Sequence, residues 1–67
     1  MKALGKRIKE LRKVQGFSQE DLSYEADIPL SQVGRIERGE INPTVSTLAA
    51  ISAALGKDLK ELFNFKY

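Results

Sequence analysis

Residues 17–39 read FSQEDLSYEADIPLSQVGRIERG, a stretch that predicts two short helices around a tight turn. Ser18 is a good N-cap for the first helix, because its side-chain oxygen can accept a hydrogen bond from a free backbone N–H. Asp21 stands where a capping box would carry Glu or Gln, so we expect an imperfect box. Asp27 tolerates the left-handed conformation that the turn needs, and Pro29 suits the start of the next helix.

The second helix is expected at about Leu30–Arg38, where Gly39 would end it in a left-handed conformation. Successive residues turn by about 100°, so the helix has two distinct faces. One face collects Val33, Ile36 and Glu37. The opposite face collects Ser31, Arg35 and Arg38, flanked by Leu30, Gln32 and Gly34. A helix anchored by an apolar face, with arginines and short hydrogen-bonding groups facing outwards, suits insertion into the major groove of DNA.

A specific set of residue types runs through both helices and the turns beside them. It comprises Ser18-Gln19-Glu20-Asp21-Leu22, Ala26, Ile28, Val33, Ile36-Glu37-Arg38-Gly39 and Asn42-Pro43-Thr44. This set resembles the lambda-repressor-like, Cro-type (XRE) helix-turn-helix family, over about residues 4–63. The resemblance implies a compact, all-α domain of five helices, in which helices two and three form the helix-turn-helix. Asp27 departs from the usual Gly, and Pro29 departs from the Ser or Thr that often caps the recognition helix.

The composition favours one globular domain, residues 1–67. A chain of 67 residues buries about 60% of its unfolded surface, and 42% hydrophobic with 30% charged residues fits a soluble domain. The absence of Cys and His removes disulfides, thiolate metal sites and the commonest general base, so we expect no catalysis, metal or cofactor. No apolar run approaches the roughly 18 residues of a membrane span, and no signal peptide is visible, so we expect a cytoplasmic protein.

Positive charge is concentrated at the start of the chain. Residues 1–17 hold six basic residues and one acidic residue, whereas residues 18–29 hold four acidic residues and no basic one. We expect a first helix at about Lys2–Gln15 with two stripes. The apolar stripe is Leu4, Ile8, Leu11 and Val14, and the basic stripe is Lys2, Lys6, Lys9 and Lys13. The basic stripe is either a DNA-facing strip or the ordinary solvated face of a surface helix.

Two further helices are expected after the loop at residues 40–43. Thr44 is a plausible N-cap for the first of them, which Gly56 ends. Its buried stripe is Leu48, Ile51 and Leu55. Asp58 then caps the last helix, with Glu61 completing a capping box. The inward-facing residues of that helix are Leu59, Leu62 and Phe63.

The outward positions divide into base-reading and phosphate-binding residues. Base reading is assigned to Leu30, Ser31, Gln32, Gly34 and Arg35, and phosphate binding to Ser18, Gln19, Arg38 and Asn42. A guanidinium in mid-helix can reach a guanine, an apolar side chain can touch a thymine methyl, and a helix start presents free N–H groups to a phosphate. Gln19 could instead be an ordinary surface residue at a helix start. The family resemblance further implies a structural ion pair between Arg12 and Glu37.

The last five residues hold three aromatic side chains, more than a small core can readily bury. They either pack against the first helix or contribute to a homodimer interface, which we assign to Leu59, Phe63, Phe65 and Tyr67. Two functions fit the sequence. The first is a sequence-specific transcriptional regulator that binds a two-fold operator in double-stranded DNA as a homodimer. The second is an antitoxin-type interaction module that neutralises a partner protein and binds DNA only for autoregulation.

Overall fold

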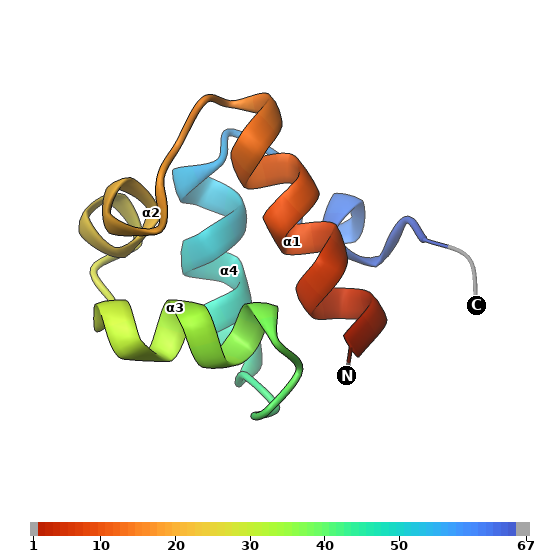
Figure 1. Ribbon diagram of the computed structural model, residues 1–67. Coiled ribbons are helices and arrows are strands. Elements are labelled where there is room, and N and C mark those ends of the chain that lie inside the picture. The colour runs from red at the N-terminus through yellow and green to blue at the C-terminus, as the bar shows by residue number, and fades with distance from the viewer. Residues whose placement is uncertain (1, 66–67) are drawn as a thin grey trace.

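The computed structural model describes residues 2–65, which form four α-helices and one short 3₁₀ helix (Figure 1). The helices are α1 (Lys2–Val14), α2 (Gln19–Ala26), α3 (Leu30–Glu37), α4 (Val45–Ala54) and η1 (Leu59–Phe63). None of the described residues forms a strand, so the prediction of an all-α fold is confirmed. The expected fifth α-helix is wrong in type, because η1 is a 3₁₀ helix.

The start of α2 and the turn between α2 and α3 have the geometry that their residues predict. The Ser18 hydroxyl accepts from the Asp21 backbone N–H at 3.0 Å, and Asp21 Oδ2 accepts from the Ser18 N–H at 2.8 Å. Asp21 therefore completes a capping box that we expected to be imperfect. Asp27 takes the left-handed conformation, with φ of 57°, and Pro29 occupies the N-cap position of α3 without a side-chain hydrogen bond.

The capping box expected at Asp58 is not formed. Asp58 makes no side-chain hydrogen bond to η1, and the Glu61 N–H instead donates to the Asp58 backbone oxygen at 2.9 Å. Arg7 engages the Glu61 side chain, with Nη2 3.5 Å from Glu61 Oε2, while its Nε donates to the Glu61 carbonyl at 2.9 Å. These contacts tie η1 to α1 rather than capping η1.

One hydrophobic cluster holds the elements together. Its buried members are Leu4, Ile8, Leu11, Leu22, Ala26, Val33, Ile36, Leu48, Ile51, Leu55 and Leu62. Val14, expected in the apolar stripe of α1, is 76% exposed. It lies about 120° around the helix from Ile8, so it rotates off the buried face.

The 3₁₀ geometry decides which side chains of η1 are buried. With about three residues per turn, Leu59 and Leu62 share a face that packs towards the core. Phe63 is one residue further round and is 48% exposed, so its expected inward orientation is wrong.

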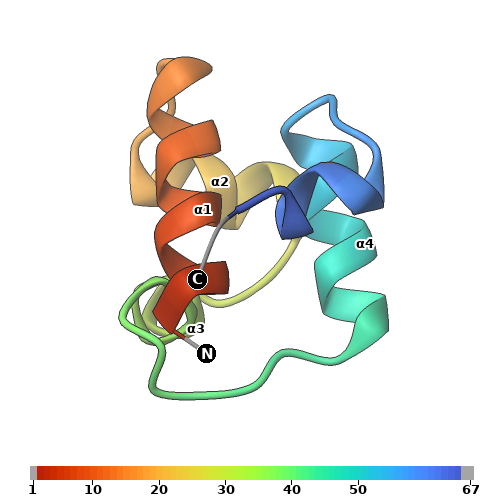
Figure 2. The same ribbon diagram turned by 90° about the vertical axis from the view of Figure 1, so that its right-hand side faces the viewer.

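The helices are arranged so that α3 is covered on one side only. It packs against α1 and α2, while η1 packs against both α1 and α4 (Figure 2). In the same view, α3 lies at the lower end of α1, where the first turns of α1 cross it. Within residues 2–65, no helix is both long and apolar enough to cross a membrane.

The crossing of α1 and α3 depends on a glycine that the sequence did not single out. A Cβ atom on Gly5 would lie 2.4 Å from the Ile36 carbonyl oxygen and 2.6 Å from that of Glu37. Both neighbours are backbone atoms of α3, so neither can rotate away. Gly5 is therefore required for the close approach of the two helices, although glycine inside a helix lowers its intrinsic stability.

Gly5→Ala should lower the free energy of unfolding by about 1–3 kcal/mol, because the added methyl group forces α1 away from α3. Gly34→Ala is the matched control within α3. The nearest atoms to its Cβ would belong to the Arg38 guanidinium, with Nη1 at 2.9 Å, and this group is the far end of a flexible side chain. That variant should be as stable as the parent or up to about 1 kcal/mol more stable, because alanine favours the helix. Urea denaturation compares the two, and equal midpoints would mean that the α1–α3 crossing tolerates a side chain.

Candidate nucleic-acid interface

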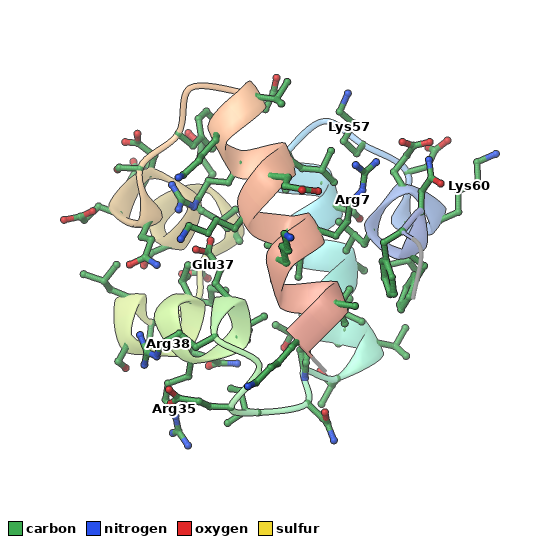
Figure 3. The ribbon with its side chains drawn as sticks, turned by 45° about the vertical axis from the view of Figure 1, so that its right-hand side comes forward. Arg7, Arg35, Glu37, Arg38, Lys57 and Lys60 are labelled. Carbon is green, nitrogen blue, oxygen red and sulfur yellow. The ribbon has the colours of Figure 1, made fainter. Side chains whose placement is uncertain are left out.

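The outward face of α3 is defined here as Ser31 and Arg35 of the helix together with its C-cap residue, Arg38, and all three residues are exposed to solvent. The opposite side of the helix is buried through Val33, Ile36 and Glu37. Figure 3 shows the Arg35 side chain extending away from the body of the protein and the Arg38 side chain lying along the outer side of α3, while Glu37 points towards the body. The two faces are therefore oriented as the helical spacing predicts.

A buried ion pair fixes this orientation. Arg12 Nε lies 2.7 Å from Glu37 Oε2, and Arg12 Nη2 lies 3.1 Å from Glu37 Oε1. The two side chains are only 8% and 3% exposed, respectively. Arg12 Nη1 also donates to the Phe17 carbonyl at 2.8 Å. This is the pair that the family resemblance implies, and its guanidinium joins α1, α3 and the segment that leads into α2.

Gln19 takes part in the same network. Its side-chain amide donates to Glu37 Oε1 at 3.1 Å, so the start of α2 is held against the end of α3. Sequence reasoning assigned Gln19 to phosphate binding and did not foresee this contact. A side-chain amide has two N–H donors, so one can hold Glu37 while the other remains at the helix start.

The predicted base-reading residues differ in their access to solvent. Leu30, Ser31 and Arg35 are exposed, and Gln32 is half-buried. Gly34 is buried, which corrects the expectation that it flanks an open surface. The guanidinium of Arg38 lies over it, with Nη1 2.9 Å from the position of a Cβ on that glycine.

Glu40 is the residue of this face that sequence reasoning missed. Its carboxylate accepts from Arg38 Nε at 2.6 Å and from Arg38 Nη2 at 3.4 Å. The same carboxylate lies 3.9 Å from Arg35 Nε. The hydrogen bond from Arg38 holds the pKa of Glu40 below its usual value, and the same bond raises the pKa of Arg38. A sequence signal existed, because opposite charges flank Gly39, which turns the chain with φ of 75°.

Residues 8–62 match the HTH_3 helix-turn-helix family. The chain belongs to this family. The resemblance to the lambda-repressor-like (XRE) family that the sequence indicated is confirmed. The helix-turn-helix that it implied is formed by α2 and α3.

Two relatives of known sequence carry regulatory names. The immunity repressor protein of Bacillus phage phi105 is 42% identical over 53 residues, which are 79% of this chain and 37% of that repressor. The HTH-type transcriptional regulator SinR of Bacillus licheniformis is 36% identical over 64 residues, 94% of this chain and 58% of SinR. The chain thus spans less than two thirds of these two relatives.

A solved structure matches over nearly its whole length. The crystal structure of the restriction-modification controller protein C.AhdI from Aeromonas hydrophila has a TM-score of 0.91 and 35% identity. The match covers 92% of this chain and 94% of the controller. The arrangement of helices around the outward face of α3 is therefore shared with this restriction-modification controller protein.

Arg12→Ala should lower the free energy of unfolding by about 3–5 kcal/mol, because it leaves the buried Glu37 carboxylate without its cation. Lys9→Ala, on the exposed side of the same helix, removes an equal charge and should cost less than about 1 kcal/mol. Chemical denaturation of both variants measures the difference. Equal losses would show that the Arg12–Glu37 pair contributes nothing beyond surface charge.

Proposed function

We propose that this protein is a sequence-specific DNA-binding transcriptional regulator that acts in the cytoplasm and places α3 in the major groove. The observation that carries the proposal is the outward face of α3, held in orientation by the buried Glu37 in a chain of the HTH_3 family. The major groove admits an α-helix and presents a distinct hydrogen-bonding pattern for each base pair. The protein acts by binding and not by catalysis.

Within this proposal, α3 reads bases along its exposed side. Arg35 is in mid-helix, where its guanidinium can donate to O6 and N7 of a guanine. Ser31, one turn earlier, supplies a short hydroxyl, and Leu30 supplies an apolar group for a thymine methyl. Gln32 and Gly34 border these side chains. Gly34 is buried and acts indirectly, because its missing side chain leaves room for the Arg38 guanidinium to lie over it.

Phosphates are bound at the two ends of the helix-turn-helix. Ser18 and Gln19 are at the start of α2, where the helix dipole and the backbone N–H groups outside the capping box favour an anion. Arg38 and Asn42 are at the end of α3 and in the loop that follows, and both are exposed. Such contacts fix the position of the protein on the duplex without reading its sequence.

The relatives favour a regulator over an antitoxin. The names immunity repressor, transcriptional regulator and restriction-modification controller all describe those proteins as regulators. They lend no support to the alternative of an antitoxin-type module. Repression is the mode of action we infer from the phage repressor.

Enrichment of random duplexes on the purified protein tests the proposal directly. A regulator of this kind should select a consensus in which two half-sites are related by a two-fold axis, about one helical turn apart. The spacing of the half-sites then gives the distance between the two α3 helices of the bound protomers. Failure to enrich any sequence, with the protein folded, would overturn the proposed function.

Arg35→Ala should weaken operator binding by about 1–3 kcal/mol and flatten the preference at one base pair, while binding to scrambled duplex changes less. Arg38→Ala should weaken binding to both duplexes alike and reduce the salt slope by about one. Titrations at several salt concentrations measure both variants. If Arg35→Ala weakened both duplexes equally, Arg35 would be a phosphate contact and not a base reader.

We further propose that the protein binds its operator as a homodimer, using residues at its C-terminal end. Leu59 and Phe65 are partly buried against the core, and Phe63 is the most exposed of these side chains. Tyr67, which we assign to the same interface, lies outside the described residues. Exposed apolar surface, which Phe63 supplies among the described residues of this end, is a common site of self-association.

Phe63→Asp should weaken the dimer, because it places a charge in the apolar contact, with little change in thermal stability since Phe63 is half-exposed. Tyr24→Asp is the control, because Tyr24 is an exposed aromatic residue on α2, away from the proposed interface. Sedimentation at tens of micromolar, with and without operator, measures the mass. A parent protein that is monomeric in both conditions, or a dimer indifferent to Phe63→Asp, would contradict this interface.

A further inference from the structure

An acidic side chain occupies the cationic part of the outward face of α3. Glu40 follows the end of α3, and its carboxylate lies within 4 Å of a guanidinium nitrogen of both Arg35 and Arg38. The shorter contact, 2.6 Å, is to Arg38 Nε, and the longer, 3.9 Å, is to Arg35 Nε. Glu40 is thus bound chiefly by Arg38, the arginine to which we assign phosphate binding.

The contact uses the edge of the guanidinium that a phosphate would use. Glu40 accepts from Nε and Nη2 of Arg38, which are adjacent donors on one side of the planar group. Carboxylates and phosphates both accept from such a pair of parallel N–H groups. The remaining side of the Arg38 guanidinium, Nη1, lies over Gly34. A DNA phosphate that approaches Arg38 along this edge therefore meets a position already filled by an anion.

We propose that Glu40 is an internal competitor for the phosphate-binding edge of Arg38, and that it lowers the affinity of the protein for duplex DNA of any sequence. This inference rests on the proposed function. The competitor is displaced when DNA binds, so that Arg38 exchanges one anion for another. The free carboxylate then also repels the phosphates around it.

The exposure of the pair makes this exchange feasible. The Arg38 and Glu40 side chains are 59% and 49% exposed, and ion pairs in such surroundings are weak. A phosphate can therefore replace Glu40 at a small cost in free energy. Glu40 then lowers the affinity for DNA without abolishing binding. Because phosphate contacts carry no sequence information, the reduction should be the same for operator and for unrelated duplex.

Substitution, and not pH, is the way to remove the competitor. Arg38 holds the pKa of Glu40 below its usual value, so the carboxylate is charged throughout the neutral range. Glu40→Gln keeps the size of the side chain and removes the charge. Asp58→Asn is the matched control, because Asp58 is exposed, makes no capping hydrogen bond and precedes η1, away from α3.

Titration against the enriched duplex and against a duplex of random sequence tests the inference. Glu40→Gln should tighten binding to both by the same factor, up to about fivefold, and steepen the salt slope by up to about one. Asp58→Asn should change neither affinity. Unchanged affinity in Glu40→Gln, or weaker binding to the enriched duplex alone, would overturn the inference, the latter by making Glu40 a base contact.

A double-mutant cycle separates competition from simple repulsion. In the Arg38→Ala background there is no edge to compete for, so Glu40→Gln should tighten binding by a smaller factor than in the parent. An equal factor in both backgrounds would contradict competition. A parent protein that binds neither duplex would instead overturn the proposed function, so the two failures are distinguishable.

Discussion

The buried pair between Arg12 and Glu37 is the interaction on which the other features of this small protein depend. The guanidinium holds both carboxylate oxygens and the Phe17 carbonyl, and Gln19 donates to the same carboxylate. A buried charge is tolerated only when its partners are complete, and within residues 2–65 no buried side-chain nitrogen or oxygen lacks a hydrogen bond. Because Glu37 is held inwards, α3 cannot rotate about its axis, and Arg35 must face solvent.

Most of the fold could be predicted because its signals are local. The cap at Ser18, the left-handed residue Asp27 and the cap at Thr44 each depend on a few neighbouring residues, and each has the expected geometry. The capping box expected at Asp58 was a local signal that failed. Two other errors arose where a helical period was extended too far along the chain. Val14 belongs to the last turn of α1, where the buried stripe has rotated away. Phe63 belongs to a 3₁₀ helix, whose shorter period changes the inward face.

The parts of the site that sequence reasoning missed are contacts between segments. From the sequence alone, Gly5 is only a residue of low helix propensity. Its role becomes clear in the fold, where the Ile36 carbonyl oxygen of α3 lies 2.4 Å from the position that a Cβ on Gly5 would take. Gln19 looks like a surface residue until Glu37, 18 positions later, is brought to its amide. Neither contact follows from spacing along one helix, because both depend on how two helices cross. The pairing of Arg38 with Glu40 depends instead on the rotamers of two exposed side chains.

The protein uses the same pair of residue types, arginine and glutamate, for two opposite purposes. Arg12 and Glu37 are almost fully removed from water, so separating them would strand a charge, and the pair is permanent. Arg38 and Glu40 are about half exposed, so water and ions can replace either partner, and the pair is exchangeable. Burial, and not the identity of the residues or the length of the contact, distinguishes them, since the short distances are 2.7 and 2.6 Å. The permanent pair therefore fixes the orientation of α3, and the exchangeable pair allows Arg38 to bind another anion in place of Glu40.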